Sequence, residues 1–406
     1  MMPPNRRLLT AGEGGREQGQ RIFLIALLIY VPVAVFSQVQ GIREIFLSTG
    51  FLYFIRRLVF LMLVLKIALD GLKISMSQGV ILLLAALQFF FSGGGSLLYL
   101  LTFALAARDV SLRTISKILL LTIAISVSVI VLLTTCGITA DYVITGSGWR
   151  GERHSLGFRN PNTLACYVLA LIYASFVVFE KKRTMFLSIF AIALSTFIVT
   201  KTRSLVFGVV ALVLSYLFFQ NSSRKVRRAV LLSFPLLVVL LLFFLYQFSY
   251  GPLETKLDEI VSSRFSCCVC LVLQNSPITL FGDLSLLSKG AALFAKNGAT
   301  AFDNSYAKCV LACGVIGTTI FVLTISLGLL RNSNNTKLLA LCTAVCFMGC
   351  IESIMFNPVV AFPLLKILAD GMDIFPRKEE ATKLFANRNF RRVLPEVCQG
   401  TRGRER

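Results

Sequence analysis

The sequence predicts an all-α membrane protein that crosses the bilayer about twelve times, and three observations support this. Of its 406 residues, 56% are hydrophobic and 15% are charged, whereas a soluble domain carries roughly 25% charged residues. One soluble core stops growing at about 250–300 residues, so it could not enclose so many apolar side chains. Apolar runs approaching the ~20 residues of a spanning helix also recur along the chain. Lipid is therefore the expected solvent for most of the surface.

The expected membrane helices follow one another with short gaps. They occupy the ranges 21–38, 51–69, 79–92, 94–107, 118–136, 161–179, 184–200, 204–220, 229–249, 305–330, 338–356 and 358–370. The third and fourth are short and meet at residues 92–96, Ser-Gly-Gly-Gly-Ser, where glycine breaks a helix. This pair is either re-entrant or a tightly turned hairpin. No small-residue cleavage site follows the first run, so we expect a retained helix rather than a signal peptide.

Charge sets the expected orientation. The chain has 41 Lys and Arg against 20 Asp and Glu, a net charge of +21. Such an excess would suggest nucleic acid in a soluble protein, but here the basic residues lie mostly between apolar runs, as cytoplasmic anchors do, so no nucleic-acid partner is expected. With the N-terminus inside, the cytoplasmic segments carry 27 Lys and Arg and the outside segments 10.

The domain organisation follows from this orientation. We expect a cytoplasmic tail at 1–20, a transmembrane domain at 21–370 and a basic cytoplasmic tail at 371–406. The two sizeable outside segments are 137–160 and 250–304.

Some basic residues depart from the charge bias, among them Arg150, Lys201 and four arginines that we consider as binding residues. Arg153, Arg159, Arg203 and Arg264 all fall in or beside the outside segments. One interpretation is contact with lipid headgroups by snorkelling. The other is anion binding, because a guanidinium fork matches phosphate oxygens bidentately and stays charged. A membrane protein that meets phosphate outside the membrane would most naturally meet a lipid-linked pyrophosphate.

The metal-ligating residue types are sparse. His154 is the one histidine, and no Asp-x-Asp occurs in the outside segments. Cys267, Cys268 and Cys270 form a tight cluster, but no second cysteine pair or histidine group accompanies it. We therefore expect neither a metal nor a cofactor, and the role of the cysteine cluster stays open.

Several short motifs occur in order along the chain. Residues 153–163 read Arg-His-Ser-Leu-Gly-Phe-Arg-Asn-Pro-Asn-Thr and lead into an apolar run, where Asn160 or Asn162 can cap the helix and Pro161 suits its first turn. The further motifs are Thr-Lys-Thr-Arg-Ser at 200–204, Leu257 through Arg264, Leu-Phe-Gly at 280–282, Asp-Asn-Ser-Tyr at 303–306 with Gly-Val-Ile at 314–316, and Glu352.

Together these motifs resemble those of the Wzy-type polysaccharide polymerases and their O-antigen ligase relatives, over roughly residues 100–370. The sequence departs from the family pattern in places. Thr202 stands where serine is usual, Ser263 replaces a glycine, and residues 266–270, Ser-Cys-Cys-Val-Cys, are an unusual insert. The loop after it is more apolar than is common, and 276–295 could form an amphipathic helix on the outer interface.

The resemblance implies a metal-independent, GT-C-like glycosyltransferase in a bacterial inner or plasma membrane. Such an enzyme joins undecaprenyl-pyrophosphate-linked oligosaccharides into capsule, exopolysaccharide or O-antigen at the outer face. Its partners would be membrane lipid, a flippase and a chain-length regulator.

The same resemblance assigns expected roles to residues. Arg153, Arg159, Arg203 and Arg264 would share the two pyrophosphates. Asp303 would be the base, with a plain helix cap as its alternative role and His154 as the alternative base; a functional histidine stands at the corresponding position in the related ligases. Glu352 is expected to be buried beside an arginine or a helix N-terminus. The remaining supporting residues are Asn160, Asn162, Asn304 and Tyr306.

Three other functions stay open. A ligase of the same fold would move finished chains onto another acceptor, and Asp303-Asn304 in place of a histidine favours the polymerase. A flippase for lipid-linked oligosaccharide would place its charges at the midplane and show paired repeats; here the charges lie at the outer mouth and no repeat is visible. The third is a membrane scaffold without enzymatic activity.

Overall fold

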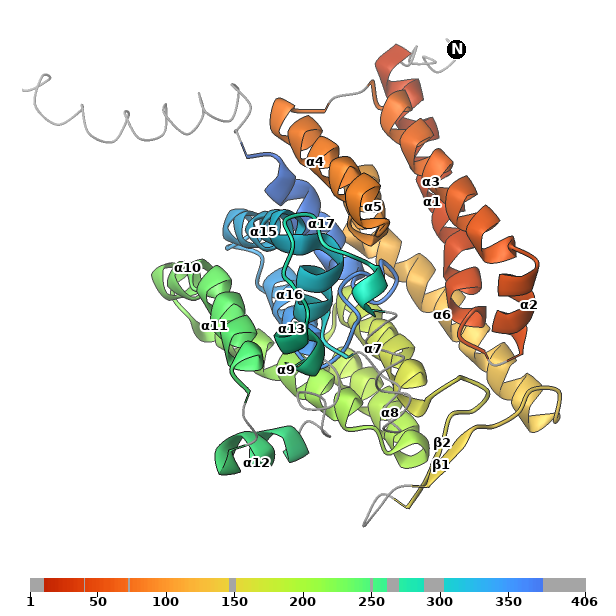
Figure 1. The fold of residues 1–406 in the computed structure, drawn as a ribbon. Coiled ribbons are helices and arrows are strands. Elements are labelled where there is room, and N and C mark those ends of the chain that lie inside the picture. The colour runs from red at the N-terminus through yellow and green to blue at the C-terminus, as the bar shows by residue number, and fades with distance from the viewer. Residues whose placement is uncertain are drawn as a thin grey trace, which may run out of the picture.

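The computed structural model describes residues 11–39, 41–71, 74–145, 151–248, 251–260, 270–287 and 303–374. These residues form a bundle of helices (Figure 1). Its first part comprises α1 (Ala11–Phe36), α2 (Ile42–Ser48), α3 (Phe51–Leu69), α4 (Met76–Ser92), α5 (Ser96–Ala107) and α6 (Leu112–Thr135). Gly93 ends α4 with a φ of 72°, which confirms a tight turn between α4 and α5.

A small β-hairpin interrupts the helices. Strands β1 (Val143–Thr145) and β2 (Glu152–His154) pair antiparallel, with Ile144 opposite Arg153. The central part of the chain then comprises α7 (Pro161–Val178), α8 (Lys182–Thr200), α9 (Arg203–Asn221), α10 (Arg224–Leu232) and α11 (Phe234–Tyr246). The all-α prediction therefore holds except for this hairpin, which lies inside the expected outside segment 137–160.

The last part comprises α12 (Pro252–Ile260), α13 (Cys270–Asn275), α15 (Ser305–Arg331), α16 (Thr336–Gly349) and α17 (Phe362–Met372). The expected helix at 338–356 is wrong for 350–356, because α16 ends at Gly349 and residues 350–361 are not helical. This non-helical stretch is mostly buried. Irregular backbone at membrane depth is tolerated where protein covers it or where it lines a cavity.

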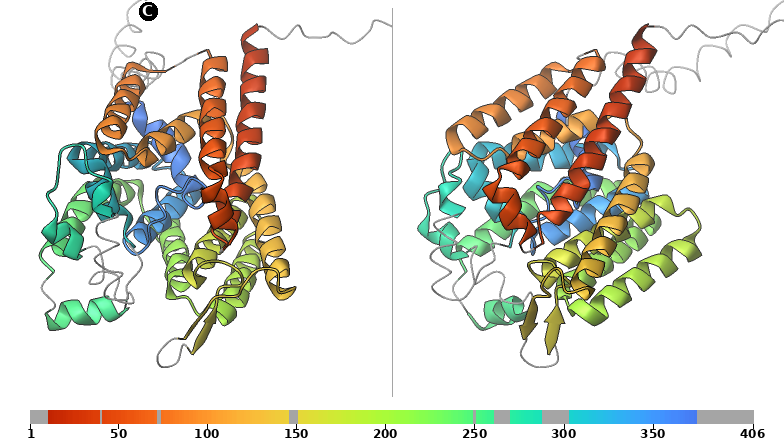
Figure 2. Two further views of the ribbon diagram at one scale, coloured as in Figure 1. Left: turned by 45° about the vertical axis from the view of Figure 1, so that its right-hand side comes forward. Right: turned by 90° about the vertical axis from the view of Figure 1, so that its right-hand side faces the viewer.

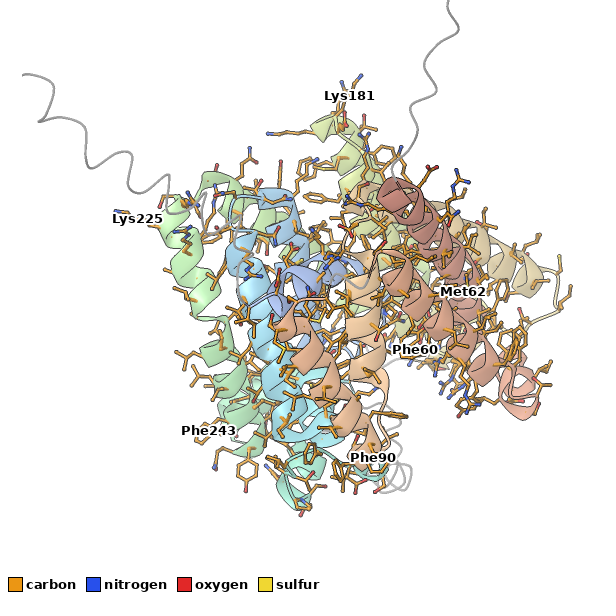
Figure 3. All side chains as sticks on the ribbon, turned by 90° about the horizontal axis from the view of Figure 1, so that it is seen from above. Phe60, Met62, Phe90, Lys181, Lys225 and Phe243 are labelled. Atoms are coloured by element: carbon orange, nitrogen blue, oxygen red, sulfur yellow. The ribbon has the colours of Figure 1, made fainter. Side chains whose placement is uncertain are left out.

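The helices have the composition of a multi-pass membrane protein. Among the described residues, seven helical segments are long and apolar enough to cross a membrane, namely α1, α6, α7, α8, α9, α10–α11 and α15. Large apolar side chains cover the periphery: Phe90 on α4 is 80% exposed and Phe243 on α11 is 62% exposed, and both point away from the bundle (Figure 3). The chain is thus a helical multi-pass membrane protein, and a count of twelve crossings stays a prediction.

Helices α7 and α15 form the centre of the bundle. In the most apolar 18 residues of each helix, 78% of the residues of α7 and 67% of those of α15 are buried, against 17% of those of α8. α15 packs against α17, and α16 packs against α9. The starts of α7 and α15 therefore lie among other helices rather than at the lipid-facing surface, and both starts contribute to the site described below.

Helix α15 is broken at Gly314, which has a φ of 66° and a ψ of −168°. The loop before α15 fills the break: Val315 N donates to the Thr279 carbonyl at 3.2 Å and Ile316 N to the Leu280 carbonyl at 3.0 Å. Gly282 lies against Gly314, so two separate motifs of the sequence meet here. The expected amphipathic helix over 276–295 is wrong for 276–284, which are not helical. Residues beyond 287 in that range lie outside the described ones.

The described ends of the chain meet at one end of the bundle. Arg16 in α1 lies 3.1 Å from Asp109, which follows α5. Ile374, after α17, donates its N–H to Ser77 Oγ in the first turn of α4 at 3.0 Å. The hairpin and α12 lie at the opposite end (Figure 2). The described ends of the chain thus lie at the same end of the bundle, and the cytoplasmic location of both termini stays a prediction.

Candidate functional site

One carboxylate, that of Asp141, holds together the two ends of the hairpin that are remote from its turn. Asp141 Oδ1 accepts hydrogen bonds from the backbone N–H groups of Ser155 (3.0 Å) and Leu156 (2.8 Å), and Asp141 Oδ2 lies 2.6 Å from His154 Nδ1. Burial alone would raise the pKa of Asp141, but the hydrogen bonds from His154 and Leu156 outweigh it and lower the pKa below its ordinary value. His154, the alternative base, is thus oriented by Asp141.

The backbone after His154 requires glycine. Gly157 has a φ of 89°, and a Cβ there would overlap Thr134 Oγ1 of α6. The close approach allows Phe158 to be fully buried and to bridge to Val39 at the end of α1. Arg159 N then donates to the Gln38 carbonyl at 2.9 Å. These contacts place Arg159 beside the end of α1, directly before α7.

Arg153 ties three elements together. Its Nη2 donates to Asn162 Oδ1 in the first turn of α7 at 2.9 Å, and its Nε to the Thr200 carbonyl at the end of α8 at 3.1 Å. Asn160 caps α7, since its Oδ1 accepts from Asn162 N at 2.7 Å, and Pro161 takes the first helical position. Arg153 and Asn162 therefore hold the hairpin on the helix starts.

Of the other two predicted arginines, the structure describes Arg203. Arg203, at the start of α9, donates through Nη1 to the carbonyl of Glu259 in α12 at 2.7 Å. Arg264 lies outside the described residues, as do Cys267 and Cys268, and the side chain of Cys270 is not described. Arg203 therefore joins α9 to α12.

Glu352 lies at a helix N-terminus, as expected from the sequence. Its side chain is 5% exposed, and its Oε1 accepts a hydrogen bond from Ser204 Oγ in the first turn of α9 at 2.6 Å. The Glu352 carbonyl accepts from Ser305 Oγ, the first residue of α15, at 2.7 Å. The non-helical stretch 350–361 thus connects the starts of α9 and α15.

The cap of α15 is Asn304 and not Asp303, so the alternative role considered for Asp303 is wrong. Asn304 Oδ1 accepts from the N–H groups of Tyr306 (2.9 Å) and Ala307 (3.0 Å), and its Nδ2 donates to the Cys350 carbonyl at 2.7 Å. Tyr306 donates its hydroxyl to the Cys346 carbonyl at 3.0 Å. Asn304 and Tyr306 are thus structural, and Asp303 stands one residue before the cap.

A cleft with two lobes lies between these elements. The outer lobe, about 630 Å³, extends to Arg43 and Glu44 of α2 and to Tyr142. The inner lobe, about 400 Å³, extends to residues of α7, α15 and the stretch 350–361. Both lobes are lined by Arg159, Asn160, Thr163 and Asp303. The cleft therefore has a guanidinium and a carboxylate at the junction of its two lobes.

The structure brings together five of the predicted site residues at this cleft: Arg159, Asn160, Asn162, Asp303 and Glu352. Sequence reasoning missed Arg43 and Lys308, which also line it. For Lys308 a signal existed, because an ionisable residue inside an apolar run is by default a functional candidate. For Arg43 there was none, because it lines the outer lobe together with Arg159, which lies 116 residues later in the chain.

Comparison of the chain with protein-family models, with curated proteins and with solved structures finds no match. The function is therefore argued from the cleft and from the motifs.

Proposed function

We propose that the protein is a polysaccharide polymerase that joins lipid-pyrophosphate-linked oligosaccharides at the outer face of a bacterial inner or plasma membrane. The observation that carries the proposal is the cleft at the helix starts, where Arg159 and Asp303 line the junction of two lobes. A polymerase must hold two large saccharides at once, a donor and an acceptor. Two joined lobes offer the space for this.

The chemistry assigns complementary roles to the two residues. The acceptor hydroxyl attacks the anomeric carbon of the donor, and the bond from that carbon to the pyrophosphate oxygen breaks. Asp303 takes the hydroxyl proton, which is the work of a general base. Arg159 offsets the negative charge that develops on the leaving pyrophosphate, as preorganised cations do in low-dielectric sites. Nucleotide sugars and ATP are not needed for this reaction.

The surroundings of the cleft support a lipid-linked substrate. The inner lobe borders α7 and α15, and its walls include the apolar residues Ile354 and Val360 and the aromatic ring of Tyr167. An undecaprenyl chain would lie in the membrane beside these helices while its pyrophosphate reaches the cleft. The ordered resemblance to Wzy-type polymerases agrees with this substrate, and a flippase and a chain-length regulator are then the natural partners.

Deletion of the protein in its native strain tests the proposal. A polymerase deletion should remove surface polymer and leave single repeat units on lipid at the outer face, where an impermeant glycosidase or lectin can reach them. Single units retained at the cytoplasmic face would show a flippase instead. Free full-length polymer on lipid, lacking only its transfer to a final acceptor, would show a ligase.

A further inference from the structure

Lys308 is a basic side chain that none of the sequence motifs explains. It lies in the first turns of α15, where its N–H donates to the Asn304 carbonyl at 3.1 Å. Its side chain lines the inner lobe together with Asp303 and Glu352. The helix start that places Asp303 at the junction of the lobes therefore also places an ammonium group deeper in the cleft.

Within the described ranges, the Lys308 ammonium has no hydrogen-bond or ion-pair partner, although it interacts electrostatically with Asp303 over a longer distance. Two other lysines within helices are paired directly: Lys66 with Asp70, and Lys366 Nζ with Asp370 Oδ1 at 3.0 Å. An ammonium within a helix long and apolar enough to cross a membrane is expensive unless it is paired. Its position against a cavity indicates an anion that enters from outside the protein.

The remaining walls of the inner lobe fit a phosphate group. The starts of α7 and α15 both border it, through Asn160 and Asp303, and helix N-termini carry partial positive charge that favours anions. Arg159 adds a guanidinium at the junction with the outer lobe. Of the predicted pyrophosphate-binding residues, Arg153 and Arg203 do not line either described lobe, so Lys308 supplies a cation that the predicted set lacks.

We propose that Lys308 binds the pyrophosphate of the lipid-linked donor in the inner lobe and stabilises it as the leaving group. This assignment rests on the proposed function. The acceptor saccharide then occupies the outer lobe, with Asp303 between the two. The new bond joins the acceptor oxygen to the anomeric carbon, the bond from that carbon to the pyrophosphate oxygen breaks with its electron pair, and the proton passes to Asp303.

Ligand-dependent thermal unfolding of the purified full-length protein in micelles tests the assignment. The probes are farnesyl pyrophosphate, inorganic pyrophosphate and farnesol. Farnesyl pyrophosphate should raise the Tm of the wild type, and farnesol should not. Lys308→Met should weaken the affinity for farnesyl pyrophosphate about tenfold or more, as expected for loss of a charged hydrogen bond. Lys308→Arg should stay within a few-fold of the wild type because it keeps the charge.

Lys182→Met is the matched control, because Lys182 is exposed at the start of α8, the far end of that helix from Thr200. It should bind like the wild type. Lys308→Gln serves as a second neutral variant if Lys308→Met does not fold, as judged by gel filtration and by the Tm without ligand.

The outcomes separate this assignment from the proposed function. Unchanged affinity in Lys308→Met or Lys308→Gln overturns the role of Lys308, even if the wild type makes polymer. Weakened affinity in these variants, together with a wild type that makes no polymer, keeps the anion site and overturns the polymerase. Equal affinity for inorganic and farnesyl pyrophosphate overturns the lipid-linked identity of the anion.

Discussion

At the scale of single residues, the start of α15 distinguishes the two roles considered for Asp303, helix cap and general base. Asn304 accepts from two helix N–H groups, so Asp303 is not needed to begin the helix. A change at Asp303 therefore tests chemistry without removing a cap. A change at Arg159 likewise tests the chemistry of the cleft, because Arg159 lines it. A change at Arg153 would instead loosen the hairpin, because Arg153 holds it on α7 and α8.

Asp303→Asn should abolish polymer while the protein still inserts and accumulates. A general base contributes about 10²–10⁴ to a rate, so the loss should be at least about a hundredfold. Polymer length and yield on gels measure it. Glu152→Gln, an exposed carboxylate on β2, is the control and should leave polymer unchanged. Near-normal polymer from Asp303→Asn would rule out this base and direct attention to His154.

Asp141 should make the hairpin sensitive to acid. Its pKa in the folded protein lies below its ordinary value of 3.8, so the fold favours the charged form. This stabilisation is complete above about pH 3.8 and is lost as the pH falls through the lower folded value. Asp141→Asn should remove much of it at neutral pH. Hydrogen exchange at the Ser155 and Leu156 amides measures the effect, and unchanged protection in the variant would contradict it.

The sequence identified residues whose role is local. Asn160 and Pro161 follow the rules of helix starts, and these depend only on neighbouring residues. A role for Lys308 could not be predicted in this way, because it depends on a cavity formed by α7, α15 and the stretch 350–361, which are far apart in the sequence. Arg203 likewise looked equivalent to Arg159 until its contact with Glu259 in α12 was known.

At the scale of elements, hydropathy located the helices because a spanning segment is a local property of the chain. It did not find the breaks. Residues 350–361 are rich in apolar side chains like the helix before them, but three of their backbone groups bond to the distant start of α15; Ser305 Oγ, for example, accepts from Met355 N at 3.2 Å. The break of α15 at Gly314 depends in the same way on carbonyl groups of residues 279 and 280.

The contact of Gly282 with Gly314 should tolerate no side chain. Both have positive φ, and a Cβ on either would overlap backbone of the other segment. Gly314→Ala or Gly282→Ala should therefore lower the free energy of unfolding by about 2 kcal/mol or more. Gly79→Ala in α4 meets no atom within 4 Å and should be neutral or stabilising. Thermal unfolding in micelles compares them; equal Tm values in all three variants would disprove the close contact.

At the scale of the whole molecule, the account depends on which side of the membrane the cleft faces. The charge asymmetry predicts that the hairpin is outside and that the start of α10 is inside. In a background in which alanine replaces Cys136, which is exposed, together with Cys267, Cys268, Cys270 and Cys398, Glu152→Cys should react with an impermeant thiol reagent in intact cells. Lys225→Cys should react only after lysis. The reverse pattern would place the cleft in the cytoplasm, away from flipped substrates.

The central claim is that this cleft transfers saccharide between lipid-linked units. The direct measurement uses purified protein in vesicles together with lipid-linked repeat units extracted from the deletion strain. The account predicts a ladder of longer saccharides and release of one undecaprenyl pyrophosphate for each bond formed, both absent with Asp303→Asn and strongly reduced with Arg159→Lys. Repeat units that stay single with active wild-type protein, or that only change leaflet, would contradict it.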